Sequence, residues 1–452
     1  MDPETSELEQ FLERHPDVEQ LDAFVIDLCG NAVGKRLPRG EFEKLFVAGT
    51  PACAAMQLVD VLGNTADPMG HGFSDGDPDA WLRPVAGMLA PVPWAGPHRA
   101  QALCEYRSAR DGGPLWYEPR QVLKRVAARF EELGIRPVVA EELEFYLIDP
   151  VRAPGAAPVA ASSPRTRAPD SKGRVLSIDK LDEFDDVLSG IEQACRAQGV
   201  PTTTTISEYG AGQFEINLKH QDDPVRAADH AALLRRAVQG VARARDLDAT
   251  FMSKPFAGES GSGLHVHLSL EDEAGRNLFD PESKHGDRML SHAVAGLQAT
   301  MGEAMAIFAP NVNVYRRFKP DQFVPVTRDW GENNRSVAFR LPVHDREGRR
   351  LEHRVAGAEA NPYLVMAAVL AGVHHGLVNK MDAGEKHSGN AGAEVDEKLP
   401  LTPWDAFRAM ENATILSDYV GADYTKIYAQ VKRAEFDAFM EDTFEREFDW
   451  YL

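Results

Sequence analysis

The chain has 452 residues, of which 43% are hydrophobic and 26% are charged, so it has the composition of a globular protein and the length of two or three domains. Asp and Glu total 70 against 49 Lys and Arg, which gives a formal net charge of −21. This acidic excess argues against a protein that binds nucleic acid or an anionic membrane, because such proteins carry basic surfaces. It allows either a solvated acidic surface or carboxylates gathered around metal ions or cationic substrates.

The cysteines and the longest apolar stretch bear on the compartment. No two of the four cysteines have CxxC spacing, so the sequence predicts neither a disulfide framework nor a cysteine zinc site, and it favours a reducing environment. The first ten residues, MDPETSELEQ, lack the basic and apolar regions of a signal peptide. Residues 363–373 are apolar but too few to span a bilayer, and we expect them to form a buried helix. We therefore expect a soluble, cytoplasmic protein.

The order of apolar and polar residues predicts a small N-terminal domain, 1–112, and a larger domain, 113–452. The small domain is expected to begin with a short helix over 5–15 and to continue mainly as strands. It has a hairpin signal at Cys29-Gly30-Asn31 and a further strand pattern over 55–62.

In the larger domain, helical and strand patterns alternate, and several strands follow one another directly. This order predicts an α+β fold with a largely antiparallel sheet. The expected helices are 119–134, 180–199 and 225–247, and the expected strands are 137–148, 202–206, 214–218, 249–252 and 265–270. The segment 151–174 is rich in Ala, Pro, Ser and Arg and is expected to be a mobile loop.

Two pairs of glutamates stand at ends of predicted strands. Glu142 and Glu144 are two residues apart, so both side chains leave the same strand face, among apolar neighbours. Glu208 and Glu215 bracket a glycine-rich turn that can bring them together. Taken alone, each pair can also be solvated acids at a strand end or a hairpin turn. Two carboxylates held close together inside a protein repel unless a cation lies between them.

A third segment alternates polar and apolar residues after a glycine-rich loop. His265, His267 and Ser269 share one strand face there, with a structural role for the histidines as the alternative. Glu352 and Arg354 share a strand face in the same way. Such oxygen-rich ligands suit Mg²⁺ or Mn²⁺ better than zinc.

Arginines accompany these carboxylates, and arginine is the residue suited to bidentate contacts with carboxylate and phosphate. They are Arg316, Arg317, Arg335 and Arg340. Metal ligands together with arginines are typical of phosphoryl transfer, and since no Walker A motif is present, the sequence excludes a P-loop enzyme.

In their order along the chain, these motifs resemble the glutamine synthetase superfamily over nearly the whole length. The matching segments are ELEFYL (142–147), EYGAGQFE (208–215), KPFAGESGSGLHVHLSL (254–270), NVNVYRRF (311–318), NNRSVAFR (333–340) and LEHRVAGAEANPYL (351–364). The resemblance implies a β-grasp N-terminal domain, a split α/β barrel and a dodecamer of two stacked hexamers with active sites between subunits. It also implies that ATP phosphorylates the γ-carboxylate of glutamate and that an amine then displaces phosphate to form an amide.

The resemblance further implies roles for individual residues. One divalent metal, Mg²⁺ or Mn²⁺, is expected at Glu144, Glu208 and Glu215. A second is expected at Glu142, His265 and Glu352. The contacts to glutamate are expected from Arg317, Arg354 and Gly261.

Phosphate contacts are implied for Arg335 and Arg340, the former as a catalytic residue, and nucleotide contacts are implied for His267 and Ser269. On a looser match, Asp60 in LVDVLGN is the aspartate that a neighbouring subunit presents to the incoming amine.

Two departures from the family concern that amine. Glutamine synthetases carry a flap glutamate six residues after the arginine matched by Arg317, whereas this chain has Phe323. Segment 389–400 also lacks the tyrosine that is adenylylated in many bacterial glutamine synthetases. An apolar residue at the gate suits an organic amine better than ammonium, and the motifs are most similar to the γ-glutamylpolyamine synthetase branch.

The sequence therefore predicts a ligase that joins glutamate to a polyamine or diamine in amine catabolism. A ligase for a monoamine (alkyl, aromatic or ethanolamine-like) is the first alternative. An assimilatory glutamine synthetase that uses ammonium is the second. A non-catalytic homologue is the third, although such a protein is expected to have lost metal ligands.

Overall fold

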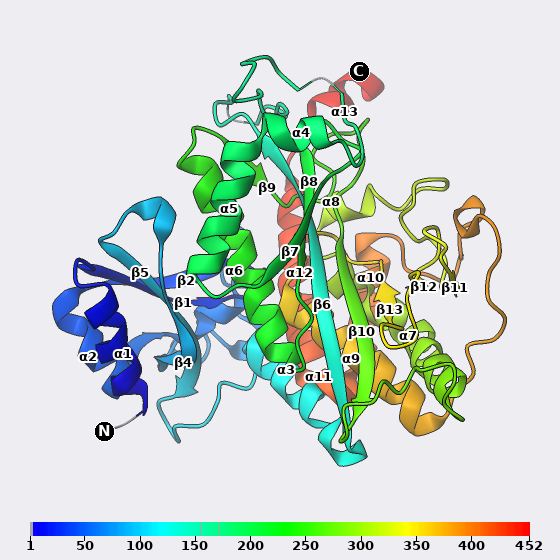
Figure 1. Cartoon of the computed structure of the whole chain (residues 1–452), viewed down its shortest axis with the longest axis horizontal. Helices are drawn as coiled ribbons and strands as arrows, with labels where there is room; N and C mark the ends of the chain where they lie inside the picture. The colour runs from blue at the N-terminus through cyan, green and yellow to red at the C-terminus, as the bar shows by residue number, and fades with distance from the viewer. Residues whose placement is uncertain (1–2, 154, 171) are drawn as a thin grey trace.

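The computed structural model describes residues 3–153, 155–170 and 172–452 and places helices around two β-sheets (Figure 1). The N-terminal sheet has the strand order β2-β1-β5-β4-β3. Its strands are β1 (Gln20–Ile26), β2 (Ala32–Pro38), β3 (Thr50–Cys53), β4 (Asp79–Pro91) and β5 (Arg99–Ser108). β1 and β2 form the predicted antiparallel hairpin, and β1 pairs in parallel with β5.

Helices α1 (Pro3–Arg14) and α2 (Phe42–Val47) pack against β4. The strand predicted over 55–62 is wrong, because Ala54–Leu58 forms a short 3-10 helix. Its buried side chains follow a helical spacing rather than strand alternation. Asp60 then closes a turn by accepting the backbone N–H groups of Leu62 and Asn64, both at 2.9 Å.

The larger sheet has the strand order β11-β12-β13-β10-β6-β8-β7, and β9 also pairs with β6. Its strands are β6 (Ile135–Ile148), β7 (Thr202–Ser207), β8 (Gln213–Leu218), β9 (Asp248–Thr250), β10 (Leu264–Asp272), β11 (Trp330–Glu332), β12 (Phe339–Leu341) and β13 (Leu351–His353). Only the β11–β12 pair of this sheet is parallel in the described part of the chain, so the predicted largely antiparallel sheet is confirmed. The predicted domain boundary at 112/113 falls in the connection that follows β5 and stays a prediction.

Helices occupy most of the remaining chain. They are α3 (Pro119–Ala128), α4 (Ile178–Glu183), α5 (Asp185–Ala197), α6 (Pro224–Arg243), α7 (Gly286–Phe308), α8 (Val312–Tyr315), α9 (Pro362–Asn379), α10 (Pro403–Glu411), α11 (Ile415–Val420), α12 (Ala422–Glu441) and α13 (Glu445–Tyr451). The helix predicted over 180–199 is divided into α4 and α5 at the buried Phe184. In the described part of 151–174 the backbone forms isolated bridges, Ile148–Ala160 and Ser162–Pro169, and its mobility stays a prediction.

The apolar stretch that was expected to be a buried helix lies in α9. By length and composition α9 could cross a membrane, but 83% of its residues are buried inside the protein. It packs closely on α7 because glycines face each other at the contact. A Cβ on Gly296 would lie 1.9 Å from the carbonyl oxygen of Gly372, and one on Gly376 would lie 1.8 Å from that of His292. The two backbones can approach this closely only without side chains there.

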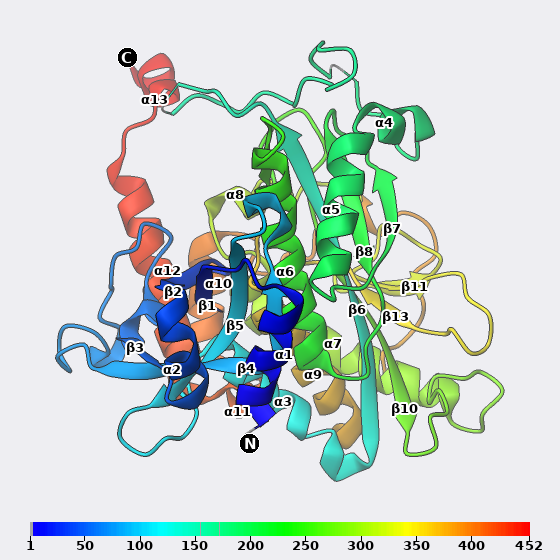
Figure 2. The same cartoon turned by 60° about the vertical axis from the view of Figure 1, so that its left-hand side comes forward.

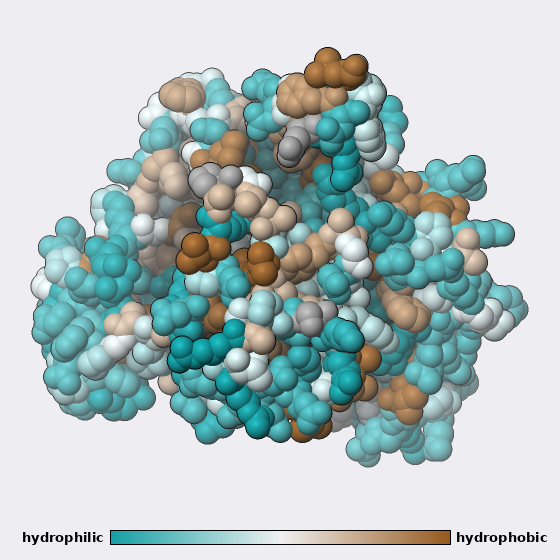
Figure 3. Space-filling model, turned by 90° about the horizontal axis from the view of Figure 1, so that it is seen from above, coloured by the Kyte–Doolittle hydropathy of each residue, from teal (hydrophilic) through white to brown (hydrophobic). Residues whose placement is uncertain are grey.

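The face seen from above is mostly hydrophilic, with hydrophobic patches scattered across it (Figure 3). At the C-terminus, α13 lies beyond the end of α12, apart from both sheets (Figure 2). Its aromatic residues Phe448, Trp450 and Tyr451 are exposed.

Candidate functional site

One face of the larger sheet gathers the predicted site residues from strands that are distant in sequence. The register places Glu352 on β13 opposite His267 on β10, and His265 on β10 opposite Glu142 on β6. It also places Glu144 on β6 directly opposite Glu215 on β8. Because side chains two residues apart share a strand face, all of these groups point to the same side. α6 packs against β6 as well, and Leu143, between the two glutamates, is fully buried.

Two groups of carboxylates and one imidazole are close enough to hold metal ions. The first is Glu142, His265 and Glu352, and the second is Glu144, Glu215 and His265. Within each group the ligand atoms all lie within 4.8 Å of one another. This donor set, rich in carboxylate oxygen, fits Mg²⁺ or Mn²⁺. His265 belongs to both groups, whereas Glu208 lines the same cavity but is in neither group.

The pKa values show how strongly these carboxylates are crowded. Burial, together with the charge of Glu208, raises the pKa of Glu144 to about 8. Burial and the charges of Glu142 and Glu144 raise the pKa of Glu215 well above its usual range. Like charges facing each other across a sheet are unfavourable, so a bound cation would relieve this repulsion.

The other end of the cluster is already compensated by positive charge. Burial opposes ionisation of Glu352, but the charges of Arg354, His267 and His265 lower its pKa to about 2. Arg340 Nη1 contacts Glu352 Oε2 at 2.7 Å, and Arg354 Nη1 donates to Glu352 Oε1. Glu352 is therefore an anion in the folded protein, as a metal ligand requires.

Three buried arginines face the same cavity with unused hydrogen-bonding capacity. Arg317, Arg340 and Arg354 are 3%, 9% and 6% exposed, and among the described residues the buried Nε of each has no hydrogen-bond partner. Burial lowers the pKa of Arg317 to about 10. A buried guanidinium with an unused donor is favourable only when an anion reaches it. The cavity is therefore suited to carboxylate or phosphate groups beside the metal ligands.

Gly261 lies against this arginine cluster. A Cβ at this position would lie 2.8 Å from Cγ of Arg317, so a side chain would displace the guanidinium. Gln213, which the sequence analysis did not single out, ties this loop to the metal ligands. Its Nε2 donates to the carbonyl oxygen of Gly261 at 3.1 Å and contacts Oε2 of Glu144 at 3.4 Å. The sequence could have indicated this role for Gln213, because Gln213 lies two residues before Glu215 and therefore shares its strand face.

The central cavity has a volume of about 640 Å³ and an adjoining cavity has about 490 Å³. Glu142, His267 and Arg350 line both of them, and Ser269 lines only the second. Arg350 Nε donates to His267 Nδ1 at 3.1 Å, while His267 Nε2 lies 2.7 Å from Glu142 Oε1. The sequence analysis also missed Arg350, which is two residues before Glu352. Arg350 and Arg354 directly flank β13, on which Glu352 lies.

Two predicted residues lie on the exposed side of the central cavity, and one lies elsewhere. Arg335 and Phe323 line the cavity, and Phe323 is 63% exposed. Asp60 is buried in its turn in the N-terminal part of the chain and does not line this cavity. Its predicted role, which requires a neighbouring subunit, stays a prediction.

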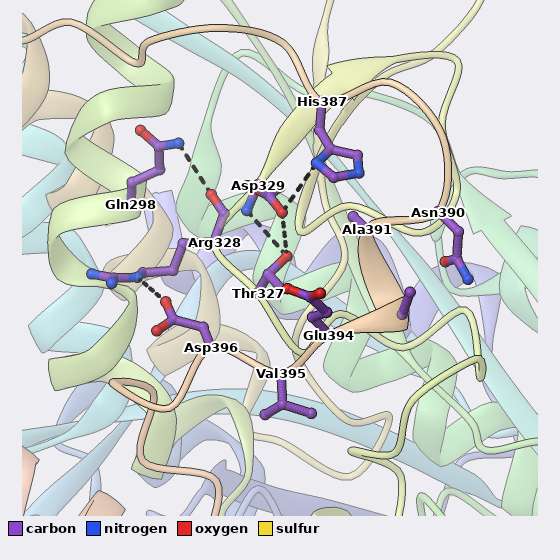
Figure 4. A pocket seen from close by; sticks show the side chains of 11 residues that line it. Gln298, Thr327, Arg328, Asp329, His387, Asn390, Ala391, Glu394, Val395 and Asp396 are labelled. Carbon is purple, nitrogen blue, oxygen red and sulfur yellow. Dashed lines mark hydrogen bonds and ion pairs between the residues drawn. The ribbon is translucent and has the colours of Figure 1, made fainter.

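A separate polar cavity of about 780 Å³ is lined by Gln298, by residues 327–329 and by residues between 387 and 396 (Figure 4). Its charged groups are largely engaged with one another. Asp329 Oδ2 accepts a hydrogen bond from Thr327 at 2.8 Å and lies 3.4 Å from Nδ1 of His387. Arg328 pairs with Asp396 at 2.8 Å.

Comparisons with known proteins agree with this geometry. The model of the glutamine synthetase catalytic domain family matches residues 116–451. The γ-glutamylputrescine synthetase PuuA of Escherichia coli K12 is 38% identical over 448 residues, which cover 99% of this chain and 94% of that protein. The glutamate–isopropylamine ligase of a Pseudomonas species is 32% identical, covering 93% of this chain and 92% of that protein.

Solved structures agree as well. An ADP complex of GmaS has a TM-score of 0.84 at 28% sequence identity, covering 98% of this chain and 99% of that one. The family uses ATP and divalent metal ions, and the chain is an ATP-dependent carbon–nitrogen ligase that forms γ-glutamyl amides. With the metal-ligand cluster, the arginines and matches that span nearly its whole length, the chain belongs to the glutamine synthetase family.

Proposed function

We propose that the amine joined to glutamate is an organic amine with an aliphatic chain, a short diamine first. The observation that carries this proposal is the apolar Phe323 at the gate of the central cavity, where the sequence resemblance places an acid in ammonium-using relatives. A phenyl ring cannot accept a proton from ammonium, but it can cover methylene groups. The name of the Escherichia coli relative, a γ-glutamylputrescine synthetase, supports a diamine.

In this proposal, the arginines bind the anionic groups of the reactants. Arg317 and Arg354 hold the α-carboxylate of glutamate, and Arg335 and Arg340 contact the phosphate that is transferred. An oxygen of the γ-carboxylate attacks the terminal phosphorus of ATP, and ADP leaves. The neutral amine nitrogen then attacks the acyl carbon, the bond from that carbon to the phosphate oxygen breaks, and the nitrogen loses a proton. Mg²⁺ or Mn²⁺, when bound at the carboxylates, supplies neutralisation of the phosphate charge.

The assembly and the setting belong to the same proposal. The N-terminal sheet, with its central parallel β1–β5 pair, supports a β-grasp module. A dodecamer with active sites between subunits would bring Asp60 of one chain to the cavity of the next. Such an enzyme would act in the cytoplasm, in amine catabolism.

A monoamine is the second candidate, and the exposed apolar residues at the gate favour it equally. Two relatives of this chain have names that give a monoamine. One is the Pseudomonas isopropylamine ligase, and the other is a γ-glutamylethanolamide synthetase of Streptomyces coelicolor, 29% identical over 91% of this chain and 88% of that protein. A monoamine requires only apolar lining, whereas a diamine also requires an acid for its second ammonium.

A panel of amines with ATP, glutamate and Mg²⁺ or Mn²⁺ tests the proposal. Phosphate release is measured with 1,4-diaminobutane, 1-aminobutane, isopropylamine, ethanolamine and ammonium, and the amide product is identified by mass spectrometry. We expect the largest kcat/KM for the diamine. If ammonium is the best substrate, the proposal is wrong and the chain is an assimilatory enzyme. If no amine supports ATP turnover with either metal, a non-catalytic homologue is the remaining interpretation.

A further inference from the structure

Asp321 lies on the exposed side of the central cavity and is not part of the carboxylate cluster. Among the described residues, the other acids that line this cavity are Glu142, Glu144, Glu208, Glu215 and Glu352, all of them predicted metal ligands. Asp321 is exposed, two residues before Phe323. It is therefore the acidic group of the cavity that a second ammonium could use without displacing a metal ion.

The loop 390–392 holds Asp321 in place. The Nδ2 of Asn390 donates to Asp321 Oδ1 at 2.6 Å, and the backbone N–H of Asp321 donates to the carbonyl oxygen of Gly392 at 3.1 Å. Asp321 has a φ of +59°, a left-handed conformation that few side chains adopt without support from their surroundings. These contacts orient the carboxylate.

The charge of Asp321 is not compensated by the protein. No ion pair joins Asp321 to Lys, Arg or His in the ranges of the chain that the structure describes. Its Oδ1 is engaged by the neutral amide of Asn390, which leaves Oδ2 to accept a hydrogen bond from a cation. A charge-assisted hydrogen bond to an ammonium group is stronger than one between neutral groups.

Apolar side chains line the same cavity as Asp321. Phe323, Leu176 and Val343 line it and are 63%, 67% and 75% exposed. Each buried methylene strengthens binding by about three- to fourfold, so an aliphatic chain covered by these residues would bind measurably better than a small amine. Ammonium has no methylene chain for these side chains to cover and no second charge for Asp321 to bind, and a monoamine would leave the carboxylate without a cation.

We propose that Asp321 binds the distal ammonium of a short α,ω-diamine while Phe323 and Leu176 cover its methylene chain. The proposal rests on the proposed function, because the other nitrogen is the one that attacks the acyl phosphate. The distal nitrogen keeps its proton throughout. Asn390 is a positioning residue, which acts through the orientation of the Asp321 carboxylate.

The test compares two amines that differ only in the distal ammonium group. Steady-state kinetics are measured with 1,4-diaminobutane and 1-aminobutane for the wild type, Asp321→Asn, Asn390→Ala and Glu394→Gln. Asp321→Asn removes the charge but keeps an oxygen that can accept from Asn390. Glu394→Gln is the matched control, because Glu394 is an exposed acid on the neighbouring loop that lines the separate polar cavity instead.

We expect Asp321→Asn to raise the KM for the diamine by about tenfold, with little change in kcat and with the KM for 1-aminobutane within about twofold of wild type. Asn390→Ala should raise the KM for the diamine by a smaller factor and leave 1-aminobutane unaffected, a split that a general loss of structure would not produce. Salt should weaken diamine binding more in the wild type than in Asp321→Asn. Glu394→Gln should behave as wild type.

An unchanged diamine KM in Asp321→Asn overturns the proposal, as does an equal loss for both amines or the same loss in Glu394→Gln. If the wild type uses 1-aminobutane with the same KM and kcat as the diamine, Asp321 does not bind the distal ammonium. The proposed ligation of organic amines is then still supported. If the wild type prefers ammonium, the proposed function fails, and this inference fails with it.

Discussion

At the scale of single residues, the carboxylate cluster is an unstable arrangement that a cation would stabilise. The pKa of Glu144 is raised to about 8 by burial and by Glu208, and burial also raises the pKa of Glu215 and Glu208. At neutral pH the metal-free protein therefore holds protons on groups that must lose them to bind a metal ion.

Metal binding should consequently release protons. Titration calorimetry with Mn²⁺ at pH 7, repeated in buffers of different ionisation enthalpy, should show net proton release, and the release should decline as the pH rises above about 8. Apparent affinity should rise with pH over the same interval, because the carboxylates of raised pKa ionise there. Glu144→Gln should reduce the number of protons released. Metal binding without proton release at pH 7 would contradict the raised pKa values.

The proposed function assigns Phe323 a second property at this scale, the choice between ammonium and an organic amine. Phe323→Glu would place a carboxylate at the exposed side of the cavity, where it can take a proton from ammonium. We expect kcat/KM for ammonium to rise by about tenfold or more and that for aliphatic amines to fall, measured by phosphate release. Phe323→Leu, which stays apolar, is the control and should not raise ammonium use. Unchanged ammonium activity in Phe323→Glu would refute the role given to Phe323.

At the scale of elements, the strands position the site and the helices keep the sheet in place. A buried ionic network joins three helices behind the sheet. Asp229 on α6 is fully buried and pairs with Arg120 on α3 through two contacts, at 2.8 and 3.0 Å. It also accepts a hydrogen bond from Tyr363 on α9 at 2.8 Å.

Breaking this network should destabilise the fold without altering the metal ligands. Asp229→Ala leaves the buried Arg120 short of a counter-charge, and we expect the free energy of unfolding to fall by about 3–5 kcal/mol. Thermal and denaturant unfolding measure the loss, while metal affinity of the folded protein should stay unchanged. Arg196→Gln is the control, because it breaks only the exposed pair with Glu192 and should cost less than about 0.5 kcal/mol. If the two substitutions lower the free energy of unfolding equally, the buried network stabilises the fold no more than an exposed ion pair does.

Some elements follow from sequence alone, and others depend on contacts. Alternation of polar and apolar residues was enough to predict β6, β8 and β10 and thereby the shared face of their glutamates and histidines. The strand predicted over 55–62 was wrong because Ala54–Leu58 is short and largely apolar, with no polar-apolar alternation, so its packing decides its type. The division between α4 and α5 is likewise set by the packing of Phe184.

At the scale of the whole molecule, the exposed aromatic C-terminus is the feature that a single chain leaves unexplained. Phe448, Trp450 and Tyr451 on α13 are 52%, 69% and 76% exposed. Exposed aromatic side chains concentrated on one short helix are typical of a surface that another chain covers. They support the proposed oligomer.

Removing this helix should weaken assembly. We expect the full chain to run as a dodecamer in native mass spectrometry and a chain that ends at Asp442 to yield smaller species. The control is the substitution Trp404→Ser, which removes an exposed aromatic side chain on α10 rather than on α13. It should leave the number of subunits in the assembly unchanged. A monomeric full-length chain, or unchanged assembly after truncation, would contradict the prediction.

The sequence by itself determined the chemistry of this protein. The spacing of Glu142 and Glu144, and of His265 and His267, fixes which side chains share a strand face, because strand alternation is a local property of the backbone. Motif order then led to the family, and the alternative of merely solvated acids was excluded when the sheet register brought these groups within metal-binding distance.

Only the tertiary structure decided which groups act together. The register of β6 against β8 places Glu144 opposite Glu215. Burial, followed by the charges of Glu142 and Glu144, raises the pKa of Glu215, and burial together with the charge of Glu208 raises the pKa of Glu144. The same holds for Asp321, since its place in the cavity depends on a loop some seventy residues later, at Asn390. Contacts between segments so far apart are set by the packing of the whole chain, which no local pattern in the sequence encodes.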